Sequence, residues 1–98
     1  TYWISDEEIQ ILEKNATNGD KNSAFKLYQY HMFVSLDQDS EFKWLEIAAK
    51  NGHPIAQSNL ADLFFTQGNK EKAIFWAKKA YRNGAKLPDE LKILININ

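Results

Sequence analysis

The dipeptide Asn-Gly recurs in this chain at nearly constant intervals. It stands at positions 18–19, 51–52 and 83–84. Glycine tolerates the left-handed conformation that commonly ends a helix, and each dipeptide therefore predicts a helix C-terminus. A nearly constant interval of this length is typical of stacked helical hairpins. The recurrence thus restricts the 98-residue chain to an array of about three hairpins.

The residues around each Asn-Gly recur as well. Large apolar residues stand seven positions before each Asn, namely Ile11, Trp44 and Trp76, and nine positions before it, namely Ile9, Phe42 and Ile74. Downstream, residues one period apart also match: Ala24 with Ala56, Tyr28 with Leu60 and Met32 with Phe64. The shared apolar pattern favours a true repeat.

Residues that start and stop helices divide the chain into six predicted helices. These begin at a Ser5–Glu8 capping box, about residue 24, the 37–40 connection, Pro54, Asn69 and Pro88. All four glycines and both prolines then fall at helix boundaries, which predicts an all-α fold. In the second helix, expected over about 24–34, the predicted core stripe is Ala24, Leu27, Tyr28 and Met32. The later stripes are Phe42, Leu45, Ala48 and Ala49, then Ala56, Leu60, Leu63 and Phe64, then Ala73, Ile74, Ala77 and Ala80.

The central segment carries a recognisable phrase. It reads Trp44-Leu45-x-x-Ala48-Ala49-x-Asn51-Gly52-His53-x-x-Ala56-Gln57-x-x-Leu60-Ala61-x-Leu63-Phe64. This resembles a Sel1-like repeat, a relative of the tetratricopeptide repeat (TPR). The resemblance implies a short right-handed α-solenoid of about three hairpins, in a single domain over 1–98. The repeats would be at about 7–34, 40–67 and 69–97, the last a degenerate cap. The first repeat matches weakly, and the Gly-rich phrase of the family's loops is missing.

Composition excludes several classes of protein. The chain is 44% hydrophobic, so it can bury a core, and it contains no cysteine for disulfides or thiolate metal sites. No apolar run approaches the roughly 18 residues that span a bilayer. The sequence predicts no membrane segment and no signal peptide. A cytoplasmic location is expected, or a periplasmic one if a leader preceded Thr1.

The net charge of −1 conceals an asymmetry along the chain. Residues 1–69 contain five Lys/Arg and ten Asp/Glu, whereas residues 70–98 contain seven and three. The acidic part can steer a basic partner. Uneven drift between terminal repeats is the alternative explanation. The basic part could contact phosphates, but its lysines alternate with core positions, as in an ordinary solvated helix face.

Candidate chemical groups are few. The two histidines are His31 and His53, and neither has the second ligand that a zinc site requires nearby in sequence. His53 lies in the recurring turn phrase and is expected to act as a turn or capping residue. His31 is expected to pack or face a groove; a general-base role is the alternative. The isolated glycines form no phosphate-binding loop. We therefore predict no metal site, cofactor or catalytic residue.

The resemblance also implies a partner surface, because the second and fourth helices line the concave face in solenoids of this type. The predicted partner-binding residues are Phe25, Gln29, Tyr30, Phe33, Ser58, Asp62 and Phe65. Exposed aromatic residues on such a face would indicate a partner. Burial of these aromatics by neighbouring helices is the alternative.

The sequence is compatible with three kinds of function. The resemblance implies a non-enzymatic module that binds a partner protein in the groove of the second, fourth and sixth helices. Small bacterial relatives in the family include immunity proteins, and the acidic part would suit a basic toxin such as a nuclease. The alternative is an accessory scaffold that is one fragment of a longer solenoid, signalled by exposure of Ile93, Ile95 and Ile97. An enzyme would require His31 near a carboxylate in a pocket.

Overall fold

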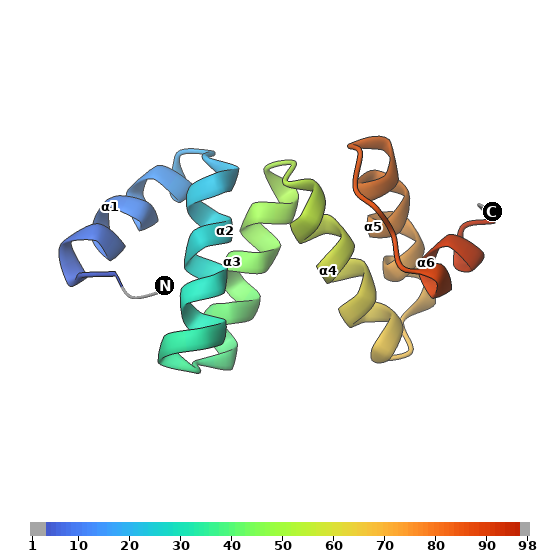
Figure 1. Cartoon of the computed structure of the whole chain (residues 1–98), viewed down its shortest axis with the longest axis horizontal. Helices are drawn as coiled ribbons and strands as arrows, with labels where there is room; N and C mark the ends of the chain where they lie inside the picture. The colour runs from blue at the N-terminus through green and yellow to red at the C-terminus, as the bar shows by residue number, and fades with distance from the viewer. Residues whose placement is uncertain (1–3, 97–98) are drawn as a thin grey trace.

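Helices follow one another along the whole described chain. The computed structural model describes residues 4–96. Within this range the fold is all-helical, with α1 (Asp6–Thr17), α2 (Lys21–Tyr30), a π-helical turn η1 (His31–Ser35), α3 (Gln38–Lys50), α4 (Pro54–Thr66), α5 (Lys70–Arg82) and α6 (Asp89–Leu94). The helices run in order from α1 at one end to α6 at the other (Figure 1), over extents of 44 × 23 × 22 Å. The predicted all-α class and six helices are confirmed.

Four helices end in the same hydrogen-bonded turn around a glycine. After α3, the N–H of Gly52 donates to the carbonyl of Ala49 at 3.1 Å, and the N–H of His53 donates to that of Ala48 at 3.0 Å. Gly52 has a φ of 98°, which glycine adopts without a steric penalty. This pair of bonds is the Schellman motif. The same pair closes α1, α4 and α5, so the interpretation of Asn-Gly as a helix end is confirmed.

Helix α2 departs from its predicted range at both ends. It begins at Lys21 rather than near residue 24, because the Asp20 carboxylate accepts the backbone N–H of Asn22 at 3.0 Å and caps the helix. At its other end the chain forms the π-helical turn, and Leu36 follows with a left-handed φ of 58°. No glycine marks this turn, and so sequence reasoning missed it.

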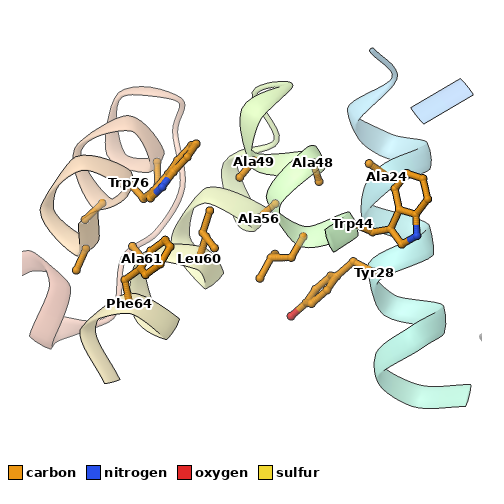
Figure 2. Close-up of a cluster of buried hydrophobic side chains, with 14 of the residues drawn as sticks. Ala24, Tyr28, Trp44, Ala48, Ala49, Ala56, Leu60, Ala61, Phe64 and Trp76 are labelled. Atoms are coloured by element: carbon orange, nitrogen blue, oxygen red, sulfur yellow. The ribbon is translucent and has the colours of Figure 1, made fainter. Parts of the chain in front are cut away.

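Small residues dominate the interfaces between helices. Eight alanines of the core are fully buried, and they let neighbouring backbones approach closely: Ala24, Ala48, Ala49, Ala56, Ala61, Ala73, Ala77 and Ala80. Leu27, Leu60 and Leu91 are the largest fully buried side chains. Figure 2 shows the two indoles, Trp44 and Trp76, at opposite sides of this alanine-rich centre.

The exposed face of α3 differs from the prediction. Leu45, Ala48 and Ala49 are buried as expected, but Phe42 is 37% exposed and Trp44 only 4%. Trp44 lies against α2 near Ala24 (Figure 2). The prediction for Phe42 was wrong because apolar spacing does not specify which side of a helix meets the preceding hairpin. Helix α5 shows the same shift, since Trp76 is buried and Ile74 only partly so.

Candidate functional site

A groove runs along the exposed face of α4. It consists of three hollows of about 610, 310 and 380 Å³. Asn59 and Asp62 line both the first and the second hollow, and Glu41, Leu45 and Leu63 line both the second and the third. We name the three together the α4 groove. Its walls come from α2, α3 and the segment 84–88 that precedes α6.

The floor of the α4 groove follows from the sequence of α4. Ser58, Asp62 and Thr66 are spaced at successive i, i+4 positions and Asn59 is adjacent, so their side chains share one face of the helix. The opposite face is apolar and buried, and it carries Ala56, Leu60 and Phe64. Because α4 packs through this apolar face, Asp62 and Thr66 of the polar face are exposed in the groove, whereas Ser58 is buried.

Two carboxylates line the middle hollow of the α4 groove. Glu41 comes from the first turn of α3 and Asp62 from α4, and both lie beside Tyr28. Among residues 4–96 the one ion pair joins Lys50 to Glu46, with Nζ and Oε1 3.9 Å apart. Neither groove carboxylate is therefore neutralised by a lysine or arginine of the described chain.

Tyr28 was predicted as a core residue, and it is buried, but its hydroxyl reaches the α4 groove. The side-chain amide of Asn59 donates to this hydroxyl at 3.4 Å. Burial, with a smaller contribution from the Glu41 carboxylate, raises the pKa of Tyr28. The phenol therefore remains neutral at pH 7 and keeps its own O–H to donate. Sequence reasoning did not bring Tyr28, Glu41 and Asn59 together. They lie on α2, α3 and α4, and no regular spacing in the sequence links them.

The wide end of the α4 groove has a different chemistry. Its walls are the exposed side chain of Ile55 and the ring of Pro88, and Lys86 contributes the cation among its lining residues. The groove therefore changes along its length from an acidic middle to a more apolar end, where Lys86 lines the same hollow as Asp62.

The predicted partner-binding residues do not form one surface. Ser58 and Asp62 line the α4 groove. Phe33 is exposed on the π-helical turn, and Phe65 is half-buried and packs against the core. The prediction placed the sixth helix, beginning at Pro88, in the groove; Pro88 lines the wide hollow together with Gly84, Ala85 and Lys86.

The other predicted residues line a separate hollow on α2, of about 290 Å³: Phe25, Gln29 and Tyr30, together with Asn22, Lys26, Ile4 and His53. The ring of Phe25 stacks on that of His53, with centroids 4.1 Å apart and an interplanar angle of 14°. Phe25 also packs against the core. Its ring is thus largely engaged within the molecule.

His53 caps α4. Its Nδ1 accepts the backbone N–H of Ala56 at 3.3 Å, as expected for a capping residue in the turn phrase. Burial lowers the pKa of His53, and the positive charge of Lys21 lowers it further. The neutral imidazole is the form that can accept this hydrogen bond.

Gln57 stands one repeat period after Phe25 and makes a polar connection in place of the ring stack. Its side chain is buried, and its amide donates to the carbonyl of Ala49 at 3.0 Å. Its amide oxygen accepts from the side chain of Asn83 at 2.9 Å. Gln57 thus joins the turn after α3 to the turn after α5.

His31 pairs with a hydroxyl rather than a carboxylate. Its Nδ1 lies 2.7 Å from Ser35 Oγ, and the same oxygen accepts the N–H of Asp37 at 3.3 Å. The Asp37 carboxylate accepts from the backbone and the hydroxyl of Ser40, at 3.4 and 2.9 Å. These bonds close a helix end and start α3. Nucleophilic catalysis would also need a third group that orients the imidazole and an oxyanion site.

Two features of the described chain bear on other classes of function. Residues 4–96 contain no group of three or more His, Cys, Asp or Glu side chains placed to hold a metal ion. Within the same range no helix combines the length and the apolar character needed to cross a membrane.

Comparison with known proteins identifies a relative of undefined function. The chain is 33% identical over 91 residues to the uncharacterized protein YibG of Escherichia coli K12. The match covers 86% of this chain and 60% of the relative, so the chain spans about three fifths of that protein's length. No family model matches the chain. No solved structure matches it either.

Proposed function

We propose that this chain is a short Sel1-like, TPR-like solenoid that binds a partner protein in the α4 groove and catalyses no reaction. Two observations support the repeat assignment. The same Schellman turn recurs at each Asn-Gly, and each helix packs mainly on the helices before and after it in sequence. Such an array presents an extended surface on which a partner can lie.

The observation that carries the binding proposal is the α4 groove itself. It joins three hollows over a helix face on which Asp62 and Thr66 are exposed. Its floor is part of the 13-residue helix α4, and its walls come from elements on both sides. A preformed surface of this kind lowers the entropic cost of binding.

The proposed partner is a bacterial toxin domain, and the proposed role is that of an immunity protein. The excess of acidic residues in 1–69 supports a basic partner such as a nuclease. The test is growth of cells that express the toxin encoded beside this gene, with and without the chain. We expect protection by the wild type, loss of protection by Asp62→Lys in the groove, and retained protection by Glu13→Lys on α1. Absence of both binding and protection by the wild type would remove this role.

The proposal that the chain catalyses no reaction can be tested at the pair formed by His31 and Ser35. Ser35 Oγ already accepts from the backbone of Asp37, and the pair belongs to one helical turn. We expect no labelling of Ser35 by a fluorophosphonate probe, which reacts with activated serines. Stoichiometric labelling that His31→Ala abolishes would instead indicate an enzyme.

A second candidate function is an accessory scaffold within a longer solenoid. Ile93 of α6 is 72% exposed, and this apolar position favours packing of a further element there. Ile95 is half-buried, and Ile97 lies outside the described residues. Sedimentation velocity of the wild type and Ile93→Glu is the test. Association that the variant abolishes supports this candidate, and a monomeric wild type at high concentration counts against it.

A further inference from the structure

We infer that the α4 groove takes a partner segment of defined chemistry: an arginine or lysine side chain in the middle hollow and an apolar side chain at the wide end. This inference rests on the proposed function, because it specifies what the proposed binding groove recognises. It commits to one occupant, a cationic segment of another protein.

The middle hollow offers acceptors and a neutral donor around an apolar base. The carboxylates of Glu41 and Asp62 stand on two different helices, and Leu45 and Leu63 lie beside them. A long cationic side chain suits this arrangement, since its methylene groups pack on the leucines while its charge meets the carboxylates.

No ion pair of the described chain joins a carboxylate of the groove to a lysine or arginine. The ion pair of the described chain lies elsewhere, between Lys50 and Glu46. Lysine and arginine are absent from the lining of the middle and third hollows. A cationic side chain would therefore gain two carboxylate contacts without displacing an internal partner, so complementary charge favours this occupant.

The hydroxyl of Tyr28 adds a neutral polar group beside the two carboxylates. Asn59 donates to this oxygen and holds it at the edge of the hollow. An anion placed there would meet both carboxylates, so the hollow rejects acidic segments as well as admitting basic ones.

The wide end sets the direction of the bound segment. Ile55 is exposed beside Pro88, and Lys86 lies in the same hollow. An apolar side chain can cover Ile55, whereas a second cation would be repelled by Lys86. The segment is therefore expected to carry its positive charge at one end of the contact only.

Peptide display on the immobilised 98-residue chain tests this inference. The probe is a phage library of random dodecapeptides, and the selected peptides are synthesised and their affinities measured by fluorescence anisotropy. The expected sequences contain a lysine or arginine near an apolar residue. Glu41→Gln/Asp62→Asn should weaken them about tenfold or more, since both charge-assisted contacts are lost. Glu13→Gln/Asp39→Asn removes the same charge outside the groove and should leave the affinity nearly unchanged.

A blocking variant separates failure of this inference from failure of the proposed function. Ile55→Trp/Thr66→Trp fills the groove from two positions that are exposed, and circular dichroism checks its fold. If the selected peptides are blocked by this variant but lack a basic residue, or tolerate Glu41→Gln/Asp62→Asn, the inference about charge is overturned and the groove remains a binding site. If the blocking variant affects no selected peptide, the proposed function is overturned together with the inference.

Discussion

Leu36 is a residue whose backbone conformation conflicts with its side chain. It has φ 58° and ψ 26°, the left-handed region, and its side chain is 72% exposed. The other turns that follow helices α1, α3, α4 and α5 use glycine in the corresponding conformation. The side chain of Leu36 buries little apolar surface, and so burial does little to offset its unfavourable backbone conformation.

Leu36→Gly is expected to stabilise the protein. The left-handed conformation costs a leucine about 1–2 kcal/mol, and the greater flexibility of glycine in the unfolded chain takes back about 0.5–1 kcal/mol. We expect a net gain of about 0.5–1 kcal/mol in the free energy of unfolding. Urea denaturation measures it. An equal or lower unfolding midpoint for the variant would contradict a strained Leu36.

His53 is expected to make stability depend on pH. Burial and Lys21 lower its pKa in the folded state, so the folded chain binds fewer protons than the unfolded chain around pH 6.5. The free energy of unfolding should therefore rise with pH in this window. As the pH falls from about 7.5, this contribution is lost, and the loss ends below the folded pKa.

His53→Asn tests this expectation because asparagine also caps helices but does not titrate. Urea midpoints are measured for both proteins at several pH values above and below 6.5. The wild type should lose more stability than the variant as the pH falls. Parallel curves would mean that protonation of His53 does not act on the α4 cap.

At the scale of elements, a chain of amide hydrogen bonds connects two helix ends. Gln57 on α4 contacts the carbonyl of Ala49 at the end of α3 and the side chain of Asn83 after α5. Gln57 is buried, and loss of its amide would remove both of these hydrogen bonds, although the carbonyl of Ala49 would still accept the N–H of Gly52. The two Asn-Gly turns are thus held in register by one side chain.

Gln57→Met keeps the length of the side chain and removes both hydrogen bonds. We expect it to cost about 1–3 kcal/mol in the free energy of unfolding, and Asn83→Ala to cost less. Because the two residues share one bond, Asn83→Ala should cost less again in the Gln57→Met background. Thermal and urea unfolding of the two single variants and the double variant measure this. Strict additivity would show that the bond contributes nothing to stability.

For the whole molecule, the place of a repeat in the array decides how deeply equivalent residues are buried. Ile11 and Trp44 occupy the same position before Asn-Gly in successive repeats, yet Ile11 is 59% exposed and Trp44 only 4%. Trp44 packs against α2, which precedes its helix (Figure 2). Helix α1 has no preceding helix within the described chain.

Alanine substitutions at these two positions are therefore expected to differ sharply. Trp44→Ala removes a buried indole and should cost about 3–5 kcal/mol, whereas Ile11→Ala should cost less than about 1 kcal/mol. Urea unfolding followed by circular dichroism measures both free energies. Similar losses at the two positions would contradict the difference in packing.

The sequence by itself determined where most of the helices begin and end, with α2 as the exception. Glycine, asparagine, proline and capping side chains act on the backbone within a few residues, and so Gly52, Pro54 and Asn69 were interpreted correctly. The cap at Ser5 follows the same rule, since its hydroxyl accepts the N–H of Glu8 at 3.2 Å. Repetition of these signals also predicted the number of helices.

The tertiary structure alone decided which faces meet. The exposure of Phe42, the stack of Phe25 on His53 and the meeting of Tyr28 with Glu41 in the α4 groove all depend on how helices are rotated and placed against one another. Apolar periodicity fixes the rotation of a helix about its own axis only to within roughly one residue position. A helix with aromatic residues on adjacent faces can bury either of them. The groove brings together side chains from three helices, and only their packing brings them into contact.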